Sequence, residues 1–297
     1  MKAMILTAMI LAAPIICAQS MSLYECIYQY DINGKTAKGD LSETYCCMLQ
    51  IGEENSRFID YAAFQLDSVS AIKGISDETV QEFERRNLNA KHYFDRHISY
   101  SGSDATLTVS APIGLNYYEY EETAPVTDWT FADDSKTVCG YTCRKATGTY
   151  GGRNWTVWYT EDIPVPYGPW KFAGLPGLVM KAVDSDSTHR FEAVSFRKGS
   201  GTIHRDNIPN VIKTDHRTFE EKKYLSDFSP MNSVNPEDVD NITVMGESIV
   251  VNGIPMRIKE KGFIPLEVPD EKTVKAAAAS RSSGGSVRVV GSGSIAK

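Results

Sequence analysis

Short segments rich in alternating, β-branched or aromatic residues recur along most of the chain. Each is bounded by turn-forming residues such as Gly, Asn and Asp, which is the pattern of a β-strand. The expected strands are Leu23–Asp31, Tyr45–Gly52, Thr106–Ala111, Leu115–Glu121, Lys136–Ala146, Arg153–Thr160, Leu178–Val183 and Arg190–Phe196. Many strands with short connections predict a mainly β (α+β) fold: a long antiparallel meander sheet, curved or half-barrel-like, with a few short helices.

Helix signals are fewer. The segment Ser76–Leu88 opens with a serine followed by two acids, which favours a helix N-terminus. Thr218 with Glu221 three residues later forms a capping box, and Pro230 would end that second helix. The segment Phe58–Ile72 is ambiguous, because its apolar residues have helical spacing while its start could extend the preceding strand.

The segment from Gly152 to Asp184 combines strand, proline and turn signals. Arg153–Thr160 alternates and places one tryptophan on each face, Trp155 and Trp158. The following Ile163–Phe172 contains three prolines, so we expect an ordered, extended loop there. The run Leu175-Pro176-Gly177-Leu178 suits a type II turn in which Gly177 has a positive φ.

Aromatic side chains on this loop leave two interpretations open. They could close one end of the sheet as part of the core, or they could form a stiff surface for a ligand or partner. In the second case Tyr167, Trp170 and Phe172 are the residues expected to face the ligand, whereas Trp155 and Trp158 serve the sheet. The residues expected to shape the loop and its turn are Gly168, Pro169, Gly174, Leu175, Pro176, Gly177 and Leu178.

The same region carries a family resemblance. The run WYTEDIPVPYGPWKFAGLPGLVMKAVD, with VCGYTCRKATGTYGGRNW and MLQIGEENSRFIDY, resembles the GLPGLI family of secreted Bacteroidetes proteins, with Val179 where the family name has isoleucine. The resemblance covers roughly Leu23 to Phe196. It implies a cell-envelope protein of a Gram-negative bacterium, and it brings neither an activity nor catalytic residues.

The N-terminus has the pattern of a secretory signal peptide. Lys2 precedes an apolar run from Met4 to Cys17, and small residues follow up to Ser20. We therefore expect an exported protein of the periplasm or cell envelope. No later stretch approaches the ~20 apolar residues that a transmembrane helix needs.

These patterns divide the chain into four parts: a signal peptide (1–20), a β-rich domain (21–230), a terminal hairpin and loop extension (231–268) and an Ala/Ser/Gly-rich tail (269–297). The hairpin is expected from Ile242–Val251 and Ile254–Ile258, which flank Asn252-Gly253. The tail is expected to be disordered, because its composition offers little apolar surface to bury.

Five cysteines follow the signal peptide: Cys26, Cys46, Cys47, Cys139 and Cys143. In an oxidising compartment they are disulfide candidates. A hairpin turning over Asn33-Gly34 would bring Cys26 close to Cys46 or Cys47. Cys139 and Cys143 could bond to each other only if the chain bends at Gly140.

Charge and motifs exclude several classes of function. The chain carries 31 Lys and Arg against 38 Asp and Glu, which argues against a nucleic-acid partner. The five histidines show no metal-ligand spacing, and there is no CxxC or GxSxG motif. We therefore expect no metal, no cofactor and no catalytic residue. Asp60, Asp67, Asp184 and Asp186 could still supply a carboxylate pair.

Three functions remain. The first is a non-enzymatic, ligand-binding or carrier-like envelope protein with an apolar or small ligand. The second is a structural or interaction partner of the outer-membrane machinery. The third is an enzyme that uses carboxylates, which only a cleft with strongly perturbed acids would favour.

Overall fold

The computed structural model describes residues 20–73, 93–124, 127–203, 210–228, 234, 237, 239–245, 248–251, 254–257 and 262–283. Most of its strands belong to one large sheet: β2 (Tyr24–Thr36), β3 (Gly39–Ile51), β4 (Asn55–Asp60), β5 (His97–Ser101), β6 (Thr106–Ile113), β7 (Asn116–Thr123), β8 (Thr130–Val138), β9 (Tyr141–Tyr150), β10 (Arg153–Thr160), β11 (Leu178–Asp184), β12 (His189–Lys198) and β14 (Ile212–Lys213). The order of this 12-stranded sheet is β14-β7-β6-β5-β4-β3-β2-β12-β11-β10-β9-β8.

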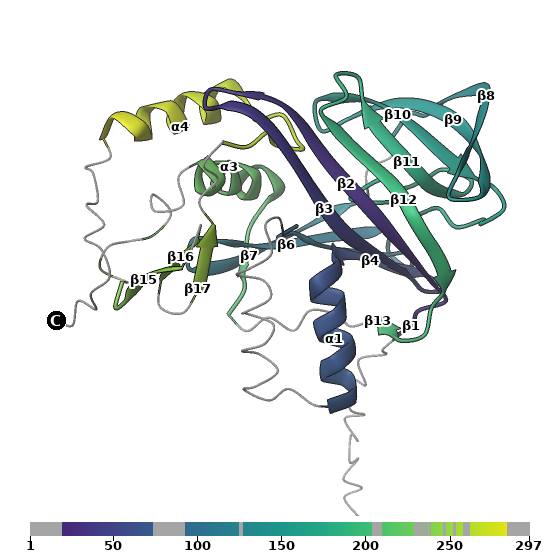
Figure 1. Ribbon diagram of the computed structural model, residues 1–297, viewed down its shortest axis with the longest axis horizontal. Coiled ribbons are helices and arrows are strands. Elements are labelled where there is room, and N and C mark those ends of the chain that lie inside the picture. Colours follow the sequence, from purple (N-terminus) through teal and green to yellow (C-terminus); the bar gives the residue numbers. More distant parts are fainter. Residues whose placement is uncertain are drawn as a thin grey trace, which may run out of the picture.

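All neighbouring strands of this sheet are antiparallel except β14, which pairs with β7 in parallel. The sheet is open, with β14 and β8 at its edges. In Figure 1 strands β8 to β12 curl to one side of the long β2–β3 hairpin, and β4 to β7 cross beneath it. The expected fold class, a mainly β protein with a curved antiparallel sheet, is confirmed.

Several strand boundaries differ from the sequence expectation, and two of the differences change the connections between strands. The expected strand Lys136–Ala146 is broken by a tight turn at Cys139 and Gly140, whose φ angles are 49° and 84°. The N-terminal hairpin does not turn over Asn33-Gly34, because β2 continues to Thr36 and Gly34 pairs with Leu41. An Asn-Gly pair is compatible with a tight turn, but here the strand pairing continues past it as far as Thr36 and Gly39.

Three helices accompany the sheet in the described residues: α1 (Tyr61–Lys73), α3 (His216–Phe228) and α4 (Glu271–Ser283). The ambiguous segment resolves into β4 followed by α1, with the Asp60 carboxylate accepting the Ala62 N–H at 2.8 Å. The second expected helix is α3, but its cap is Asp215, which accepts the Thr218 N–H at 2.9 Å. The helix expected at Ser76–Leu88 lies outside the described residues.

Helix α4 corrects the expectation of a disordered tail for residues 269–297. The segment is rich in alanine, the strongest helix former, and the Asp270 side chain accepts the N–H of Thr273 at 2.8 Å, so the helix is capped. Thr273 and Ala277 are buried, and α4 lies beside α3. Residues 284–297 of the expected tail lie outside the described residues.

Two smaller sheets complete the fold. Strands β15 (Ile242–Met245), β16 (Ser248–Val251) and β17 (Ile254–Arg257) form a three-stranded antiparallel sheet, so the expected terminal hairpin is present with an additional strand break. Strand β1 (Ser20–Met21) pairs with β13 (Thr202–Ile203). In the part of the chain that the structure describes, no helix combines the length and apolar character needed to cross a membrane.

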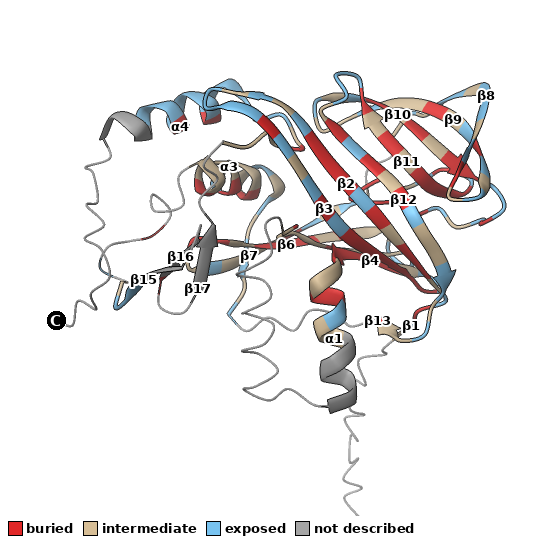
Figure 2. Cartoon of the chain, viewed as in Figure 1, coloured by how far each residue is buried: buried red, intermediate tan, exposed pale blue. Residues whose placement is uncertain are grey.

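The main hydrophobic core lies on one face of the large sheet. Alternating residues of β2, among them Tyr28 and Tyr30, and Trp155 of β10 are almost fully buried, and Figure 2 shows buried segments concentrated along β2, β3 and β10 to β12. Residues 163–175 cover this face and contribute Tyr167, Trp170 and Phe172 to the same core.

The five cysteines among the described residues are free thiols, and three of them are buried. The register of the β2–β3 hairpin explains why the expected bridge is absent: Cys26 lies opposite Leu49, whereas Cys46 and Cys47 lie opposite Gln29 and Tyr28. In this register Cys26 is offset by two residues from Cys47 and by three from Cys46, so neither is its direct partner across the hairpin.

Candidate functional site

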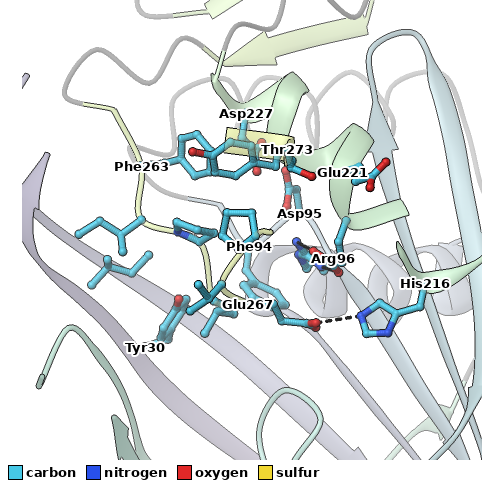
Figure 3. Close-up of a pocket in the computed structure, with 18 of the residues that line it drawn as sticks. Tyr30, Phe94, Asp95, Arg96, His216, Glu221, Asp227, Phe263, Glu267 and Thr273 are labelled. Atoms are coloured by element: carbon cyan, nitrogen blue, oxygen red, sulfur yellow. Dashed lines mark hydrogen bonds and ion pairs between the residues drawn. The ribbon is translucent and has the colours of Figure 1, made fainter. Parts of the chain in front are cut away.

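A cavity of about 410 Å³ opens between the large sheet, α3 and the segment that leads into α4 (Figure 3). Its walls come from β2 and β3, residues 93–96, α3, residues 263–270 and Thr273. These elements lie far apart in the sequence, so the fold alone brings them together. We call this cavity the acid-aromatic pocket.

One part of the lining is aromatic. Tyr30 and Tyr45 stack on neighbouring strands with ring centroids 5.3 Å apart, and Phe94 meets Tyr30 edge-on at 6.0 Å. Tyr224 of α3 contacts Phe263 with centroids 5.1 Å apart. Rings packed against one another have little rotational freedom, so this wall is already formed without a ligand.

The rest of the lining is acidic. Of the described residues around the pocket, three are basic (Arg96, His216, Arg217) and seven carry carboxylates: Glu43, Asp95, Glu220, Glu221, Asp227, Glu267 and Asp270. The three basic groups are all engaged by lining acids. Arg96 binds Glu220 through two nitrogens at 2.5 and 2.8 Å, His216 contacts Glu267 at 2.8 Å, and Arg217 contacts Glu221 and Asp270.

A buried ion network adjoins the pocket and includes two of its lining residues, His216 and Glu267. The Lys171 Nζ atom lies 2.6 Å from Glu267 Oε1 and 3.3 Å from Glu122 Oε1, and it also contacts the hydroxyl of Tyr120. The Lys171 side chain has no exposed surface. His216 bridges the two carboxylates, with Nδ1 3.0 Å from Glu122 and Nε2 2.8 Å from Glu267.

The network shifts the pKa values of His216 and Glu267 toward their charged forms. Hydrogen bonds to Glu122 and Glu267 raise the pKa of His216 to about 9, against the opposing effect of burial. Burial acts to raise the pKa of Glu267, but the hydrogen bond from His216 and the charge of Lys171 outweigh it and lower the pKa to about 2. Near neutral pH both groups are therefore ionised.

Residues 265–268 fasten the segment before α4 to the sheet. Arg153 donates from Nε to the Leu266 carbonyl at 2.9 Å and from Nη2 to the Pro265 carbonyl at 2.6 Å, and the Val268 N–H donates to Gly151 at 2.9 Å. A Cβ added to Gly151 or Gly152, which both have positive φ, would press on Glu267 or Val268. The glycine pair thus permits the close approach of this segment.

His189 supports the same segment from within the core. Its Nε2 donates to the Pro265 carbonyl at 3.1 Å, and its Nδ1 accepts from the Tyr30 hydroxyl at 2.8 Å. Burial, with the nearby charge of Arg153, lowers the pKa of His189 to about 3. The imidazole is therefore neutral, which fits one nitrogen donating and the other accepting.

His216, Glu220 and Glu267 are close enough together to be considered as metal ligands, with ligand atoms within 4.8 Å of one another. Their contacts fit an ion network better than a metal centre. Both nitrogens of His216 point at carboxylates, Glu220 is held by Arg96 and Glu267 by Lys171. A metal cation would therefore have to displace Arg96 and Lys171 and a proton of His216.

The residues expected from the sequence to face a ligand do not line this pocket. Tyr167, Trp170 and Phe172 are between 2% and 5% exposed and lie in the main core, with Trp170 5.7 Å from Trp155 between ring centroids. Trp170 adopts a φ of 53°, a backbone conformation that costs a large side chain energy and is held here by packing. This placement favours the interpretation of the loop as a core lid.

One expectation about the turn residues of the same motif is wrong. Gly177 does not have a positive φ; Gly174 does, at 83°. Gly177 is needed for another reason, because a Cβ there would lie 2.0 Å from the Thr160 carbonyl oxygen. Gly168 is similarly crowded by Val179, while Leu175 and Leu178 are buried. Pro169 accepts the N–H of Phe172, and Pro176 is exposed.

The candidate carboxylates named from the sequence do not form a pair. Asp60 accepts the N–H groups of Ala62 and Phe94, and Asp67 pairs with buried Arg57. Asp184 binds Arg153 at 2.9 Å and also accepts the His189 N–H. Asp60 and Asp184 thus have structural roles at the ends of β4 and β11, and Asp67 has one within α1.

Sequence reasoning missed the residues that do converge. Lys171 lies within the proline-rich motif, but nothing in that motif marks it as buried. His216 and Glu220 are four residues apart, which places them on one face of a helix, and this spacing was the available signal. Glu267 lies 51 residues from His216 and 96 residues from Lys171, so no local pattern connects them.

Comparisons with known proteins bear on the motif more than on the pocket. Residues 150–181 match the model of a family described as a protein of unknown function, Porph_ging. No curated protein matches the sequence. Among solved structures, PNGF-II in its P21 and C2 space groups is similar at 15% and 16% identity, with TM-scores of 0.47 and 0.45. Each alignment covers 78% of this chain and 36% of the PNGF-II chain.

Proposed function

We propose that this protein is a non-enzymatic ligand-binding protein of the bacterial cell envelope, and that its ligand occupies the acid-aromatic pocket. The observation that supports this most directly is the cavity of about 410 Å³. Pockets for small molecules commonly measure about 300 to 1,000 Å³ and combine aromatic walls with a few placed polar groups.

The polar groups of the pocket favour binding over acid–base catalysis. A general acid or base works best when its pKa lies near the working pH. Glu267, with a pKa of about 2, and His216, with a pKa of about 9, are instead held in their charged forms by each other and by Lys171. Such a network fixes the shape of a site without exchanging protons near neutral pH.

The cellular location is part of the proposal. Residues 1–20 have the composition of a signal peptide, and the family match at residues 150–181 falls on the motif that carries the resemblance to the GLPGLI family of secreted Bacteroidetes proteins. N-terminal sequencing of the exported protein should begin near Gln19 or Met21. A chain in the envelope fraction that retains Met1 would contradict export by cleavage.

Native mass spectrometry tests the binding function. Protein purified under non-denaturing conditions from the envelope of a producing bacterium should carry a small-molecule adduct. Glu221 lines the pocket from α3 and is partly exposed, so Glu221→Trp should fill the cavity and remove the adduct. Lys222→Trp is the matched control, because Lys222 is on the exposed side of the same helix and does not line the pocket.

The proposal requires that Glu221→Trp loses the adduct and that Lys222→Trp retains it. An adduct that persists in Glu221→Trp, or one that is lost equally in Lys222→Trp, would show that the pocket is not the binding site.

A further inference from the structure

We infer that strands β8 to β12 carry a second binding site on the face opposite the main core, where an acidic oligosaccharide binds with one carboxylate between Lys136 and Lys181. This site goes beyond the acid-aromatic pocket and does not depend on its ligand. Strand β10 defines the two faces, because Trp155 and Val157 are buried in the core while Trp158, one residue further on, is partly exposed on the other side. We call that other side the outer face.

The outer face is open in the described part of the chain. In Figure 1 the three described helices lie away from strands β8 to β11, so none of them covers this face. A side chain on it can therefore meet a ligand without a rearrangement of the fold.

Two lysines of the outer face reach the same indole ring from opposite sides. Lys181 of β11 pairs directly with Trp158 of β10. Lys136 of β8 extends across β9, so that its Nζ atom lies 4.1 Å from the centre of the Trp158 ring. Lys181 is close enough for its charge to act on the Lys136 ammonium group. Because like charges repel, an anion placed between the two lysines would be attracted by both.

This cluster has more positive than negative charge, although the whole chain has a net charge of −7. Its one carboxylate, Glu192, is shared, since it accepts from Lys181 at 2.8 Å and from Arg190 Nε at 2.9 Å. Lys136 forms no ion pair with an acid of the described residues. Burial, followed by the charge of Lys181, lowers the pKa of Lys136 to about 8. Three cations around one carboxylate thus favour the binding of a further anion.

An open cavity of about 630 Å³ lies beside the cluster on the outer face. Thr156, which lines it, is two residues from Trp158 on the same strand, so the two side chains point the same way about 6.6 Å apart. The polar side chains of the lining are mostly hydroxyls and an amide: Thr130, Thr147, Thr149, Asn154, Thr156 and Ser185, with Asp128 as the one charged group.

Three of these hydroxyls stand in a row across neighbouring strands. Thr147 of β9 pairs with Thr130 of β8 on one side and with Thr156 of β10 on the other. None of the three side chains makes a hydrogen bond to another described residue. A hydroxyl group both donates and accepts, which is the property needed to bind the hydroxyl groups of a sugar.

The cluster and the cavity together select the class of ligand. A neutral sugar would leave the two lysines uncompensated, and an acidic peptide would place no hydroxyl groups in the cavity. A chain of sugars that carries carboxylates can satisfy both parts at once, with a carboxylate at the lysines and the neighbouring ring beside the threonines.

Isothermal titration calorimetry of the full mature protein with three probes tests this class. The probes are hexagalacturonate, neutral maltohexaose and hexaglutamate, an acidic peptide without hydroxyl groups. We expect saturable binding of hexagalacturonate with a Kd that rises with salt concentration, and binding of the other two that is weaker by about tenfold or more. Tighter binding of hexaglutamate or maltohexaose, or binding of none of the three, would overturn the inference.

Variants of exposed and partly exposed residues locate the ligand. Lys136→Gln should weaken hexagalacturonate binding about tenfold, the size of one charge-assisted contact. Lys145→Gln on β9 is the matched control and should change the Kd less than about twofold, because Asp134 already binds Lys145 at 2.8 Å. Thr147→Val keeps the shape of the side chain but removes its hydroxyl, so it should weaken the binding of hexagalacturonate and leave that of hexaglutamate unchanged.

Equal losses in Lys136→Gln and Lys145→Gln would show general attraction to a basic surface and would overturn the placement of the carboxylate. The second site and the proposed function fail separately. Glu221→Trp, which fills the acid-aromatic pocket, should leave hexagalacturonate binding unchanged. If Glu221→Trp abolishes it, the oligosaccharide binds in the acid-aromatic pocket and the second site is wrong.

Discussion

Lys171 and Glu267 form an ion pair of 2.6 Å in which the lysine side chain has no exposed surface and the glutamate side chain is 11% exposed. The lysine comes from the proline-rich motif and the glutamate from the segment before α4, 96 residues later. This contact joins the core lid to the lining of the acid-aromatic pocket, to which Glu267 belongs.

Glu267→Gln should therefore destabilise the protein by about 3 kcal/mol, because it leaves a buried lysine without its nearest counter-charge. Equilibrium unfolding in urea measures the change. Glu271→Gln removes a carboxylate from an exposed i,i+4 pair with Lys275 and should change the free energy of unfolding by less than about 0.5 kcal/mol. Similar losses for both variants would contradict the importance of the buried pair.

Two histidines with opposite pKa shifts predict a stability maximum near pH 6.5. The folded pKa of His216, about 9, lies above its ordinary value of 6.5, so its contribution is complete below pH 6.5 and is lost as the pH rises through 9. The folded pKa of His189, about 3, lies below 6.5, so its contribution is complete above pH 6.5 and is lost as the pH falls through 3.

Chemical unfolding at a series of pH values between 4 and 9 measures how the free energy of unfolding depends on pH. His216→Gln should make its decrease toward alkaline pH smaller, and His189→Gln should make its decrease toward acidic pH smaller. Glu267, whose folded pKa of about 2 lies below its ordinary 4.5, adds a further loss of stability below pH 4.5. A maximum above pH 8 or below pH 5 in the wild-type protein would be inconsistent with these shifts.

Gly177→Ala should cost about 3 kcal/mol or prevent folding, because its Cβ would lie 2.0 Å from the Thr160 carbonyl oxygen, which belongs to the neighbouring strand β10. The reason is steric and does not involve a positive φ. Gly201→Ala, where a Cβ would meet nothing within 4 Å, is the control and should be nearly neutral. Thermal unfolding compares the two, and a tolerated Gly177→Ala would show that β10 can move away.

Trp155→Ala and Trp170→Ala should both lower the free energy of unfolding by about 3 to 5 kcal/mol, because both side chains are almost fully buried and contact each other. Trp158→Ala should cost less, about 1 kcal/mol, since Trp158 is partly exposed beneath Lys136. If Trp170→Ala left stability unchanged, the loop would not be a core lid, and the ligand surface expected from the sequence would regain support.

Thiol labelling tests whether the five cysteines are free thiols, as they are in the structure. In the native protein a maleimide should modify Cys46 first, because it is exposed, while Cys26, Cys47 and Cys143 are buried and burial raises the pKa of each thiol. After unfolding without a reductant all five should react. Recovery of fewer than five thiols would show a disulfide that the structure lacks.

The strands of the sheet could be predicted from the sequence where burial alternates. Arg153–Thr160 has its expected bounds because Trp155, Val157 and Tyr159 are buried on one face. The first half of β8 was missed. As an edge strand it is mostly exposed, so residues such as Asp133 and Asp134 lie within it and no apolar period marks it.

The pocket could not be predicted, for a different reason. Its groups come from β3, the loop at residues 93–96, α3 and the segment before α4, and each appears locally as an ordinary charged or aromatic residue. Trp170 shows the same limit: its sequence neighbours predict a loop, and only tertiary packing makes that loop part of the core.

The strand order has a kinetic consequence. From β2 to β7, and again from β8 to β12, each strand pairs with its neighbour in the sequence, so both halves of the sheet can form from nearby segments. The pairing of β12 with β2 joins the halves, and along it Arg197 binds Glu25 across 172 residues at 2.8 Å. Because closing so long a loop is slow, the β2–β12 seam should be the last major contact to form, and refolding should be limited by the docking of two preformed half-sheets.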